Sequence, residues 1–407
     1  MESKRMPDTN NMISLAAARE IVATVIGNVK LPTEEIPLRQ ATGRILAEDQ
    51  LSAIDIPPFN KSAMDGYAIP PGKGCDEYRV LETVAAGDIP QQQLTPGTSV
   101  KVMTGAPVPE GMVKVVMIEK TSEADGKVRI VRPDSASHIC CKGEDVCCGD
   151  MILKAGTILG PADIGNLISV GISNVKVARR VQISIISTGN EIVDCRDELA
   201  AGKIMNANGP LLSALCRRYG LDVVSEQIVP DELDKTVVSL KEAMERADII
   251  VLSGGVSVGQ YDFVAEAMKR ADLTIHFDRL AVKPGKPMTF AASNGKAVMG
   301  LPGNPVAVYL MFHLFVLYAA RLLSGRKTDL TFTALPLGFN FRRRKADRMA
   351  FIPCRLQTDG ALGKIDYHGT AHLMALSSSD GFFRVPKEIK KLSAGEKVDF
   401  IYFHQEL

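Results

Sequence analysis

Three short glycine-containing segments each follow an apolar run, a pattern suited to binding a phosphate. They begin at Ser187 (STGNEIV), Ser253 (SGGVSVGQYD) and Gly300 (GLPGNPVAV). Glycines after a buried strand let backbone N–H groups approach an anion, and the next helix adds the positive end of its dipole. A tight strand-to-helix turn is the alternative for any one of them. The candidate ligand-binding residues are Ser187, Thr188, Gly189, Gly254, Gly255, Ser257, Gly259, Pro302, Gly303, Asn304 and Pro305.

Two of these loops also carry a carboxylate, Glu191 in the first and Asp262 in the second. A carboxylate beside a phosphate is repulsive unless a cation lies between them. The pairing therefore indicates a hard metal such as Mg²⁺, held by carboxylates and substrate oxygens. The loops lack both the Walker A lysine pattern and the G-x-G-x-x-G pattern, which disfavours ordinary P-loop or Rossmann binding.

A basic segment, RLAVKPGKPMTFA, adds Arg279, Lys283 and Lys286. Prolines 284 and 287 would stiffen the backbone around the lysines, and a stiff basic loop suits an anionic ligand. A solvated loop with incidental charge is the alternative. Asp65, within PPFNKSAMDGYAI, is a further acidic candidate, although a turn aspartate explains it equally well.

The elements that would position these residues form a repeating pattern. From about residue 180 to 327, apolar strands alternate with helices, which predicts a parallel α/β sheet. Residues 70–135 and 328–407 show strands and turns, which predict two small β-rich domains. A helix is expected after Ser14 as N-cap, and another with Asp234 as candidate cap. The apolar stretch 306–320 is too short to span a bilayer and predicts a core helix.

Composition excludes several classes. The formal net charge of the 407-residue chain is +1, which argues against nucleic-acid and membrane-surface partners. The first residues, MESKRMPDTNNM, lack a signal-peptide core, so a cytoplasmic protein is expected. The pairs Cys140/Cys141 and Cys147/Cys148 do not match zinc spacing and are interpreted as reduced thiols.

Seven motifs in order resemble one family, the MoeA-type molybdopterin molybdotransferases, which include the E domain of gephyrin. They are PPFNKSAMDGYAI, VMTGAPVP, KGEDVCCGD, IISTGNEIV, LSGGVSVGQYDFV, VKPGKPMTFA and GLPGNPVAV. The resemblance covers about residues 12 to 400.

The resemblance implies the last step of molybdenum cofactor biosynthesis. Molybdate enters adenylylated molybdopterin, AMP is released, and a divalent cation, Mg²⁺ or another, assists. A molybdopterin adenylyltransferase of related α/β fold would supply the substrate. The resemblance also implies an elongated homodimer, in which the second subunit completes the active-site cleft.

The fold implied by the resemblance is multidomain, α/β plus β. Residues 12–55 and 146–179 would form an extended linker domain, and residues 56–145 a small β-rich domain. Residues 180–327 would form a MogA-like parallel α/β domain that binds molybdopterin. Residues 328–407 would form a β-barrel-like domain.

The motifs also assign residues. Asp65 and Thr104 match acidic and hydroxyl positions of the small β-rich domain, and Asp145 matches the aspartate of the GED motif. Lys283 matches the basic position of the KPGKP loop, with Arg279 near a second one, and Pro302 and Pro305 match the PGNP loop. The resemblance implies that the catalytic residues are Asp65, Thr104, Asp145, Glu191, Asp231 and Asp262. Of these, it implies that the metal ligands are Glu191, Asp231 and Asp262.

The sequence departs from the family pattern in three places: Asn190 stands where aspartate is common, Cys140 and Cys141 where arginine is frequent, and Ala307 where serine is frequent. Two other functions stay open, a catalytically degenerate gephyrin-like scaffold and the related adenylyltransferase. The residue types do not show whether the substrate oxyanion is molybdate or tungstate. They also do not show which carboxylates bind the metal and which position water. His368 and His372, four apart, are interpreted as a surface loop rather than a zinc pair.

Overall fold

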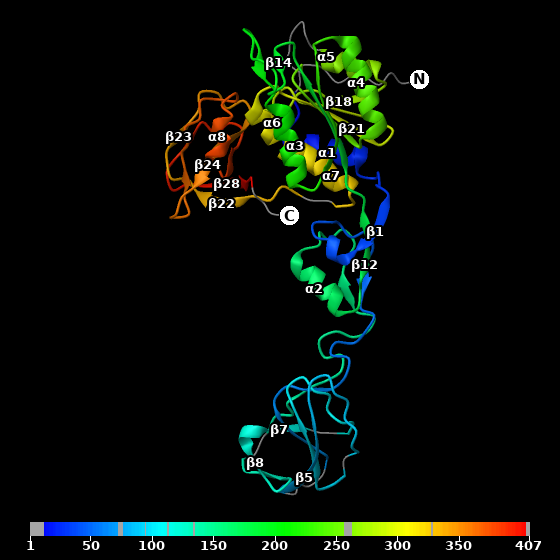
Figure 1. Ribbon diagram of the computed structural model, residues 1–407. Helices are drawn as coiled ribbons and strands as arrows, with labels where there is room; N and C mark the ends of the chain where they lie inside the picture. Colours follow the sequence, from blue (N-terminus) through cyan, green and yellow to red (C-terminus); the bar gives the residue numbers. More distant parts are fainter. Residues whose placement is uncertain are drawn as a thin grey trace, which may run out of the picture.

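The chain is elongated, with its two largest units side by side at one end and a small β unit at the other (Figure 1). The structure is a computed structural model, and it describes residues 12–71, 76–93, 95–111, 114–132, 135–255, 263–326 and 329–403. We call the parts the α/β unit, the C-terminal unit, the linker and the tip unit, and define each by its elements below.

The α/β unit is built on a six-stranded sheet in the order β16-β13-β17-β21-β20-β18. The first four of these strands are parallel, as the alternating pattern predicts. Strand β20 runs in the opposite direction, so it pairs antiparallel with both β21 and the edge strand β18. The bounds are β13 Gln182–Thr188, β16 Asp222–Val229, β17 Ile249–Ser253, β18 Thr274–Phe277, β20 Thr289–Ser293 and β21 Lys296–Leu301. A short pair, β14 Ile192–Val193 and β15 Ile204–Met205, projects after β13.

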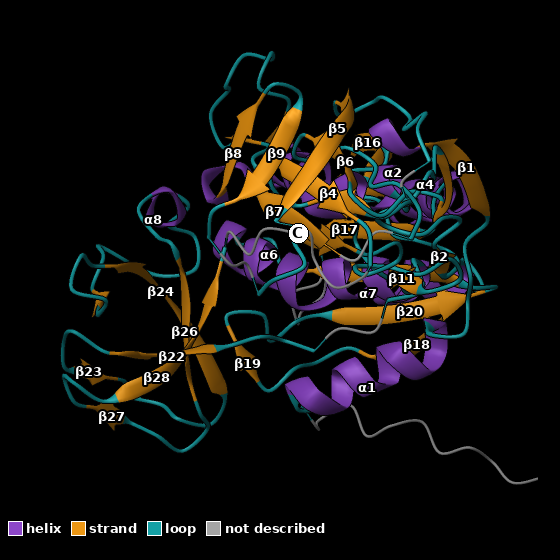
Figure 2. Ribbon diagram, turned by 90° about the horizontal axis from the view of Figure 1, so that it is seen from below, coloured by secondary structure: helices purple, strands orange, loops and turns teal. Residues whose placement is uncertain are grey.

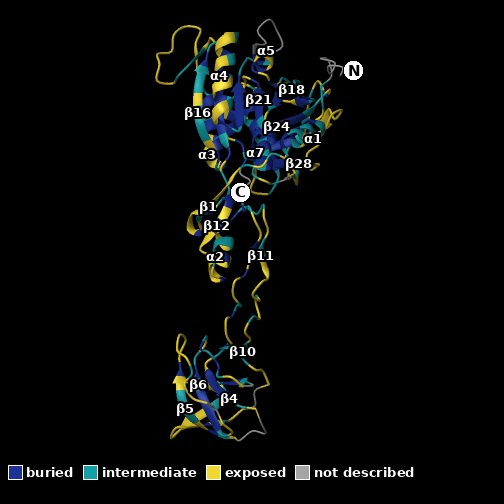
Figure 3. Ribbon diagram, turned by 90° about the vertical axis from the view of Figure 1, so that its right-hand side faces the viewer, coloured by how far each residue is buried: buried dark blue, intermediate teal, exposed yellow. Residues whose placement is uncertain are grey.

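Helices cover both faces of this sheet, which explains why its strands are continuous apolar runs rather than alternating ones. In β13, Ile185 faces the cluster built with α1, α3, α6 and α7, while Ile186 faces the cluster built with α4 and α5. Figure 3 shows this interior as the main buried region of the molecule. The helices are α1 Leu15–Ile26, α3 Asn208–Arg218, α4 Leu233–Arg246, α5 Phe263–Arg270, α6 Pro305–Met311 and α7 Leu317–Leu323.

Two helix starts test the predicted caps. Ser14 is the N-cap of α1, and its hydroxyl accepts a hydrogen bond from the N–H of Ala17 at 3.2 Å, so that prediction is confirmed. The predicted cap Asp234 is wrong, because Glu232 occupies the N-cap position and Asp234 lies within the first turn of α4. Its carboxylate still lies near the positive end of the helix dipole.

The predicted core helix is confirmed, but the judgement that it is too short to span a bilayer is wrong, because the helix extends beyond residues 306–320. α6 and α7 are joined by a π-helical turn, Phe312–Val316, into one apolar helix, Pro305–Leu323. By length and composition it could cross a membrane, but 78% of its apolar window is buried inside the protein. Burial against the sheet is the reason for its composition.

The linker consists of two passes of the chain that pair with each other. β1 Thr33–Pro37 pairs antiparallel with β12 Asn174–Ala178, and β2 Gln50–Leu51 pairs with β11 Met151–Leu153. Helix α2, Pro161–Ser169, packs beside them. The chain therefore leaves the α/β unit, builds the tip unit and returns along the same path.

The tip unit is a six-stranded sheet in the order β7-β4-β6-β5-β9-β8. The short pair β3 Lys61–Ser62 and β10 Ile139–Cys140 closes its base. The strands are β4 Gly66–Ile69, β5 Glu77–Val84, β6 Thr98–Val102, β7 Lys114–Met117, β8 Thr121–Ala124 and β9 Lys127–Ile130.

The C-terminal unit shares its core with the α/β unit. Phe351, Phe382 and Phe403 belong to the same buried cluster as α6 and α7, and β19 Val282–Lys283 pairs with β24. Its elements are β22 Thr333–Pro336, β23 Phe341–Arg342, β24 Met349–Leu356, β25 Leu362–Gly363, α8 Met374–Ser377, β26 Gly381–Val385, β27 Lys391–Leu392 and β28 Lys397–Tyr402. The two units thus form one packed body.

Phe315 provides a test of this shared core. Its side chain is fully buried, with its ring centroid 6.1 Å from that of Phe277. We expect Phe315→Ala to lower the free energy of unfolding by about 3–5 kcal/mol, because it leaves a cavity in a close-packed core. Val238→Ala, at a position 56% exposed on α4, should change it by less than about 0.5 kcal/mol. Equal shifts of the two urea unfolding curves would contradict the assignment of Phe315 to the core.

Candidate active site

The structure brings the three glycine-containing loops together at one edge of the central sheet. Ser187 pairs with Ser253, and Ser253 pairs with Leu301, so the carboxyl ends of β13, β17 and β21 are level. Parallel α/β sheets bind their ligands at this edge. The loops that follow these strands therefore face the same space.

The backbone of Gly254 and Gly255 turns closely around Thr188. Both glycines have positive φ angles, 93° and 65°. A Cβ atom on Gly254 would lie 2.3 Å from the carbonyl oxygen of Thr188, and one on Gly255 would lie 2.8 Å from Thr188 Oγ1. A Cβ on Gly303 would lie 3.7 Å from Gly254 Cα, so the third loop is also in contact. Only glycine allows this approach at 254 and 255.

Three hydroxyl groups are buried at this edge without a hydrogen-bond partner in the part of the chain that the structure describes: Ser187 Oγ, Thr188 Oγ1 and Ser253 Oγ. None of the three residues is more than 3% exposed. Buried hydroxyls normally have a partner, and an unsatisfied one costs about 1–3 kcal/mol. They are available to a ligand. Ser257, Gly259 and Asp262 lie outside the described residues.

The PGNP loop is held from two sides by residues that the sequence interpretation missed. Asn208 Nδ2 donates to the carbonyl of Gly303 at 2.7 Å, and Asn304 Nδ2 donates to Thr370 Oγ1 at 2.6 Å. Pro302 is buried before the turn, and Pro305 opens α6. The α3 helix start and the C-terminal unit thus both contribute to the rim of the site.

The segment that carries Thr370 also contains the two histidines. His368 and His372 have ring centroids 5.0 Å apart in a non-helical loop, and His368 lies 3.1 Å from Asp366. A group of three or more His, Cys, Asp or Glu residues that could hold a metal is absent from the described residues. The surface-loop interpretation of this segment is consistent with its exposure.

Two of the three predicted metal-binding carboxylates lie on neighbouring loops. Asn190 connects them: its N–H donates to Asp231 Oδ2 at 3.3 Å, and its Oδ1 accepts from the Asp231 N–H at 3.1 Å. The Glu191 carboxylate folds back over Gly189, where a Cβ would lie 2.7 Å from Oε2. An aspartate at position 190 could accept the same hydrogen bond from the Asp231 N–H, but its charge would repel the nearby Asp231 carboxylate, and the neutral amide avoids this.

The oxygen donors of this region fit a hard cation. Mg²⁺ is usually held by one or two carboxylates together with waters and substrate phosphates, rather than by a complete protein cage. Glu191 and Asp231 supply carboxylates of this kind beside the glycine loops. The third predicted ligand, Asp262, lies outside the described residues.

The basic loop packs against α6. Gly285, with φ 113°, approaches Met311 so closely that a Cβ would lie 2.5 Å from the methionine methyl carbon. Lys283 is exposed and Lys286 is half-buried, while Arg279 Nε is buried with no partner among the described residues. Met311 ends α6, whose seven residues span about 10 Å. The basic loop therefore packs at the end of α6 that lies opposite to the PGNP loop.

Asp65 and Thr104 contact each other in the tip unit. Asp65 Oδ1 accepts hydrogen bonds from the Thr104 N–H at 2.6 Å and from its hydroxyl at 2.8 Å. The Thr104 N–H, and then the hydroxyl, hold the pKa of Asp65 below its usual value. Both residues are exposed, so the carboxylate is ionised and accessible.

Asp145 lies at the base of the tip unit with an exposed side chain, and its N–H donates to Ile56 O at 2.9 Å. The neighbouring Cys140, Cys141, Cys147 and Cys148 are free cysteines. The N–H groups of Cys147 and Cys148 donate to Asp150 and Asp55, so these residues shape the turn that joins linker and tip.

The predicted site residues therefore fall into two groups at opposite ends of one chain. Figures 1 and 3 show the tip unit separated from the α/β unit by the length of the linker. Within a single chain the structure does not bring Asp65, Thr104 and Asp145 to the glycine loops.

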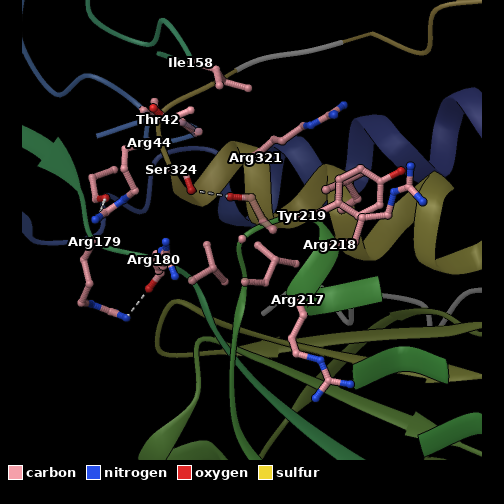
Figure 4. Close-up of a pocket in the computed structure, with 18 residues that line it drawn as sticks. Thr42, Arg44, Ile158, Arg179, Arg180, Arg217, Arg218, Tyr219, Arg321 and Ser324 are labelled. Atoms are coloured by element: carbon pink, nitrogen blue, oxygen red, sulfur yellow. Dashed lines mark hydrogen bonds between the residues drawn. The ribbon is translucent and has the colours of Figure 1, made fainter. Parts of the chain in front are cut away.

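A cavity of about 170 Å³ lies elsewhere, between the linker and the α/β unit (Figure 4). Its lining includes Val181 and Leu221, which precede β13 and β16, so it lies at the amino-terminal end of the sheet. The arginines around it point in different directions, Arg217 and Arg321 away from each other (Figure 4). It is separate from the glycine loops and does not belong to the candidate site.

The Asp65–Thr104 contact can be tested by titration. Thr104→Val removes the hydroxyl bond and keeps the N–H bond, so the pKa of Asp65 should rise yet stay below its ordinary value. Carboxyl-carbon NMR measures it, with Thr333→Val as a hydroxyl-loss control in the C-terminal unit. Because the folded pKa is lowered, the contact stabilises the protein above the unfolded pKa, and that contribution is lost as the pH falls through the folded pKa. An unchanged titration in Thr104→Val would contradict the geometry.

Comparison with known protein families matches most of the chain. Residues 13–171 match the MoeA N-terminal region (domain I and II), residues 184–322 a probable molybdopterin binding domain, and residues 335–403 the MoeA C-terminal region (domain IV). The three matches follow one another without overlap.

Curated relatives and solved structures agree with this architecture. A molybdopterin molybdenumtransferase of Staphylococcus epidermidis is 35% identical over 377 residues, which cover 87% of this chain and 90% of that protein. One from Staphylococcus aureus is 37% identical over 303 residues, 72% of each chain. The crystal structure of a molybdopterin biosynthesis MoeA protein from Pyrococcus horikosii has a TM-score of 0.83 and 28% identity, covering 97% of this chain and all of that one.

These matches confirm the multidomain α/β-plus-β fold and the resemblance that the seven motifs indicate. The chain belongs to the MoeA family of molybdopterin molybdenumtransferases.

Proposed function

We propose that this chain inserts molybdate into adenylylated molybdopterin and releases AMP. Membership of the molybdopterin molybdenumtransferase family supports the transferase activity. The observation that supports a phosphate-containing substrate is the group of three unsatisfied buried hydroxyls beside a glycine turn, at the ligand-binding edge of a parallel sheet. Such hydroxyls suit a ligand rich in oxygen atoms.

The glycine loops bind the substrate. Ser187, Thr188 and Ser253 donate their hydroxyl hydrogens to phosphate or pterin oxygens, because they have no partner among the described residues. The tight turn at Gly254 and Gly255 leaves room for those oxygens to reach the backbone. Ser257 and Gly259 continue the same loop in sequence.

The cationic residues hold the second anion. Molybdate is a dianion, and Lys283, Lys286 and Arg279 are the positive charges of the loop that packs on α6. The buried Nε of Arg279 suits a hydrogen bond to an oxyanion. Holding both reactants in one cleft lowers the entropic barrier to their reaction.

Glu191 and Asp231, with Asp262, would hold Mg²⁺ or another divalent cation. When bound, the cation neutralises charge on the phosphate oxygens and so favours loss of AMP. Asn190 fixes the Asp231 backbone and accepts the Lys203 ammonium hydrogen bond on its carbonyl at 2.6 Å. The carboxylates that do not hold the cation position the water.

A second copy of the chain completes the site. The separation of the two residue groups supports a homodimer in which the partner subunit's Asp65 and the partner subunit's Thr104 approach the glycine loops. Light scattering should give twice the 43.9 kDa mass of one chain, and a monomer at working concentration would contradict this arrangement. A molybdopterin adenylyltransferase supplies the substrate, and the reaction takes place in the cytoplasm.

Turnover tests the function directly. The purified chain, with adenylylated molybdopterin and Mg²⁺, should release AMP when molybdate is added and not before. The same assay run with tungstate determines whether the site discriminates between molybdate and tungstate. Absence of release by folded protein would favour a scaffold, and ATP-dependent formation of adenylylated molybdopterin would favour an adenylyltransferase.

The variant Ser253→Ala tests whether the Ser253 hydroxyl binds the ligand or stabilises the fold. Removing an unsatisfied buried hydroxyl should leave the unfolding midpoint unchanged or slightly higher, while substrate affinity falls about tenfold for one lost hydrogen bond. Ser239→Ala, a buried serine on α4, is the matched control and should leave affinity unchanged. A destabilised Ser253→Ala with normal affinity would show that the hydroxyl has a structural partner.

A further inference from the structure

Six exposed cations gather at the outer edge of the C-terminal unit, on and beside β23 and β27. We call them the basic ridge: Arg342, Arg344, Lys345, Lys387, Lys390 and Lys391. Figures 1 and 2 both place β23 on the side of this unit that faces away from α6. The ridge is therefore separate from the candidate active site.

The ridge places like charges opposite each other without neutralising them. Arg342 pairs directly with Lys391 across the β23–β27 ladder, an arrangement that is normally destabilising. Within the residues that the structure describes, none of the six cations has a carboxylate at ion-pair distance. The nearby Asp347 pairs with Arg348 instead.

The backbone beneath the ridge is held together by Arg343. Arg343 donates to three carbonyl oxygens, those of Ile389 at 2.7 Å, Arg348 at 2.9 Å and Pro386 at 2.6 Å. Phe341 packs edge-on against Phe383 with ring centroids 5.3 Å apart. The Arg343 guanidinium thus joins the two segments that carry the six cations. Both segments are therefore held in place before a partner binds.

An open groove runs along the ridge. Its volume is about 590 Å³, and its lining consists of Arg342, Arg343, Arg344, Lys390 and Lys391. Small-molecule pockets are mostly apolar with a few polar groups, and this one has the opposite composition. A lining made only of Arg and Lys residues favours an anionic occupant.

We propose that the basic ridge is a docking surface for an acidic, Asp- and Glu-rich segment of a partner protein. An acidic segment can follow the groove and meet several cations at once, whereas a small oxyanion would meet only a few. Nucleic acid fits less well, because the net charge of the chain is only +1. In addition, Phe341, the aromatic residue of β23, packs into the core rather than offering a stacking surface.

Docking at the ridge would leave the glycine loops accessible. The ridge lies on the far side of the C-terminal unit from α6, so a bound protein would be held close to the site without covering it. Association through such a surface is fast at low salt and weakens as salt rises.

The test uses the full chain and a fluorescein-labelled peptide of alternating Glu and Ser, with a Gln-and-Ser peptide as the uncharged comparison. At about 50 mM salt the acidic peptide should bind and the neutral one should not, because screening is weak there. Arg342→Glu/Lys391→Glu should weaken binding at least about tenfold. Lys241→Glu/Lys269→Glu makes the same change in net charge on α4 and α5 and should alter affinity less than about twofold.

Each other outcome overturns the proposal. No preference for the acidic peptide, or equal losses in the two double variants, would show general electrostatics rather than a defined surface. Tighter binding of duplex DNA or tripolyphosphate, with the same dependence on Arg342 and Lys391, would assign the ridge to a different anion. Normal melting and AMP release are expected in Arg342→Glu/Lys391→Glu, and loss of either would overturn the assignment of the ridge to docking alone.

Discussion

The pairing of Ser187 with Ser253, and of Ser253 with Leu301, determines where chemistry can take place in this protein. Because a one-residue slip would turn every side chain to the opposite face, this register fixes which hydroxyls lie at the edge and which apolar residues enter the two cores. The close turn of Gly254 around Thr188 depends on the same alignment. The three loops then share one space, in which Gly303 lies close to Gly254.

The linker imposes the second constraint. β1 and β12 run antiparallel as two passes of the same chain, so the tip unit is carried away from the sheet rather than folded back onto it (Figure 1). The Asp65–Thr104 contact lies within the tip unit, and the strands that lead into the glycine loops lie in the α/β unit. A site that uses both groups must therefore combine two subunits, and the shape of the chain is the physical reason for the proposed dimer.

Much of this architecture could be predicted because it depends on local patterns. Buried strands such as 182–188 and 249–253 are apolar runs that are followed directly by glycine. Helix α1 is predicted by Ser14 as its N-cap and by the helical spacing of the apolar residues that follow. The contributions of Asn208 and Thr370 could not be predicted in the same way, because they reach the PGNP loop across 95 and 66 residues of sequence. The cluster of polar residues at the start of α3 is the local feature of the sequence that could have indicated a role for Asn208. The reversed direction of β20 could not be predicted for a related reason, since the direction of a strand is set by tertiary pairing rather than by composition.

Subunit complementation measures most directly whether the two residue groups act together. Asp65→Asn and Glu191→Gln chains, each expected to be inactive alone, would be unfolded, mixed equally and refolded so that dimers form at random. If each site takes Asp65 from one subunit and Glu191 from the other, half of the dimers are mixed and each contains one intact site, giving about a quarter of wild-type AMP release. No recovery above the single variants, in a mixture shown to contain mixed dimers, would contradict a site shared between subunits.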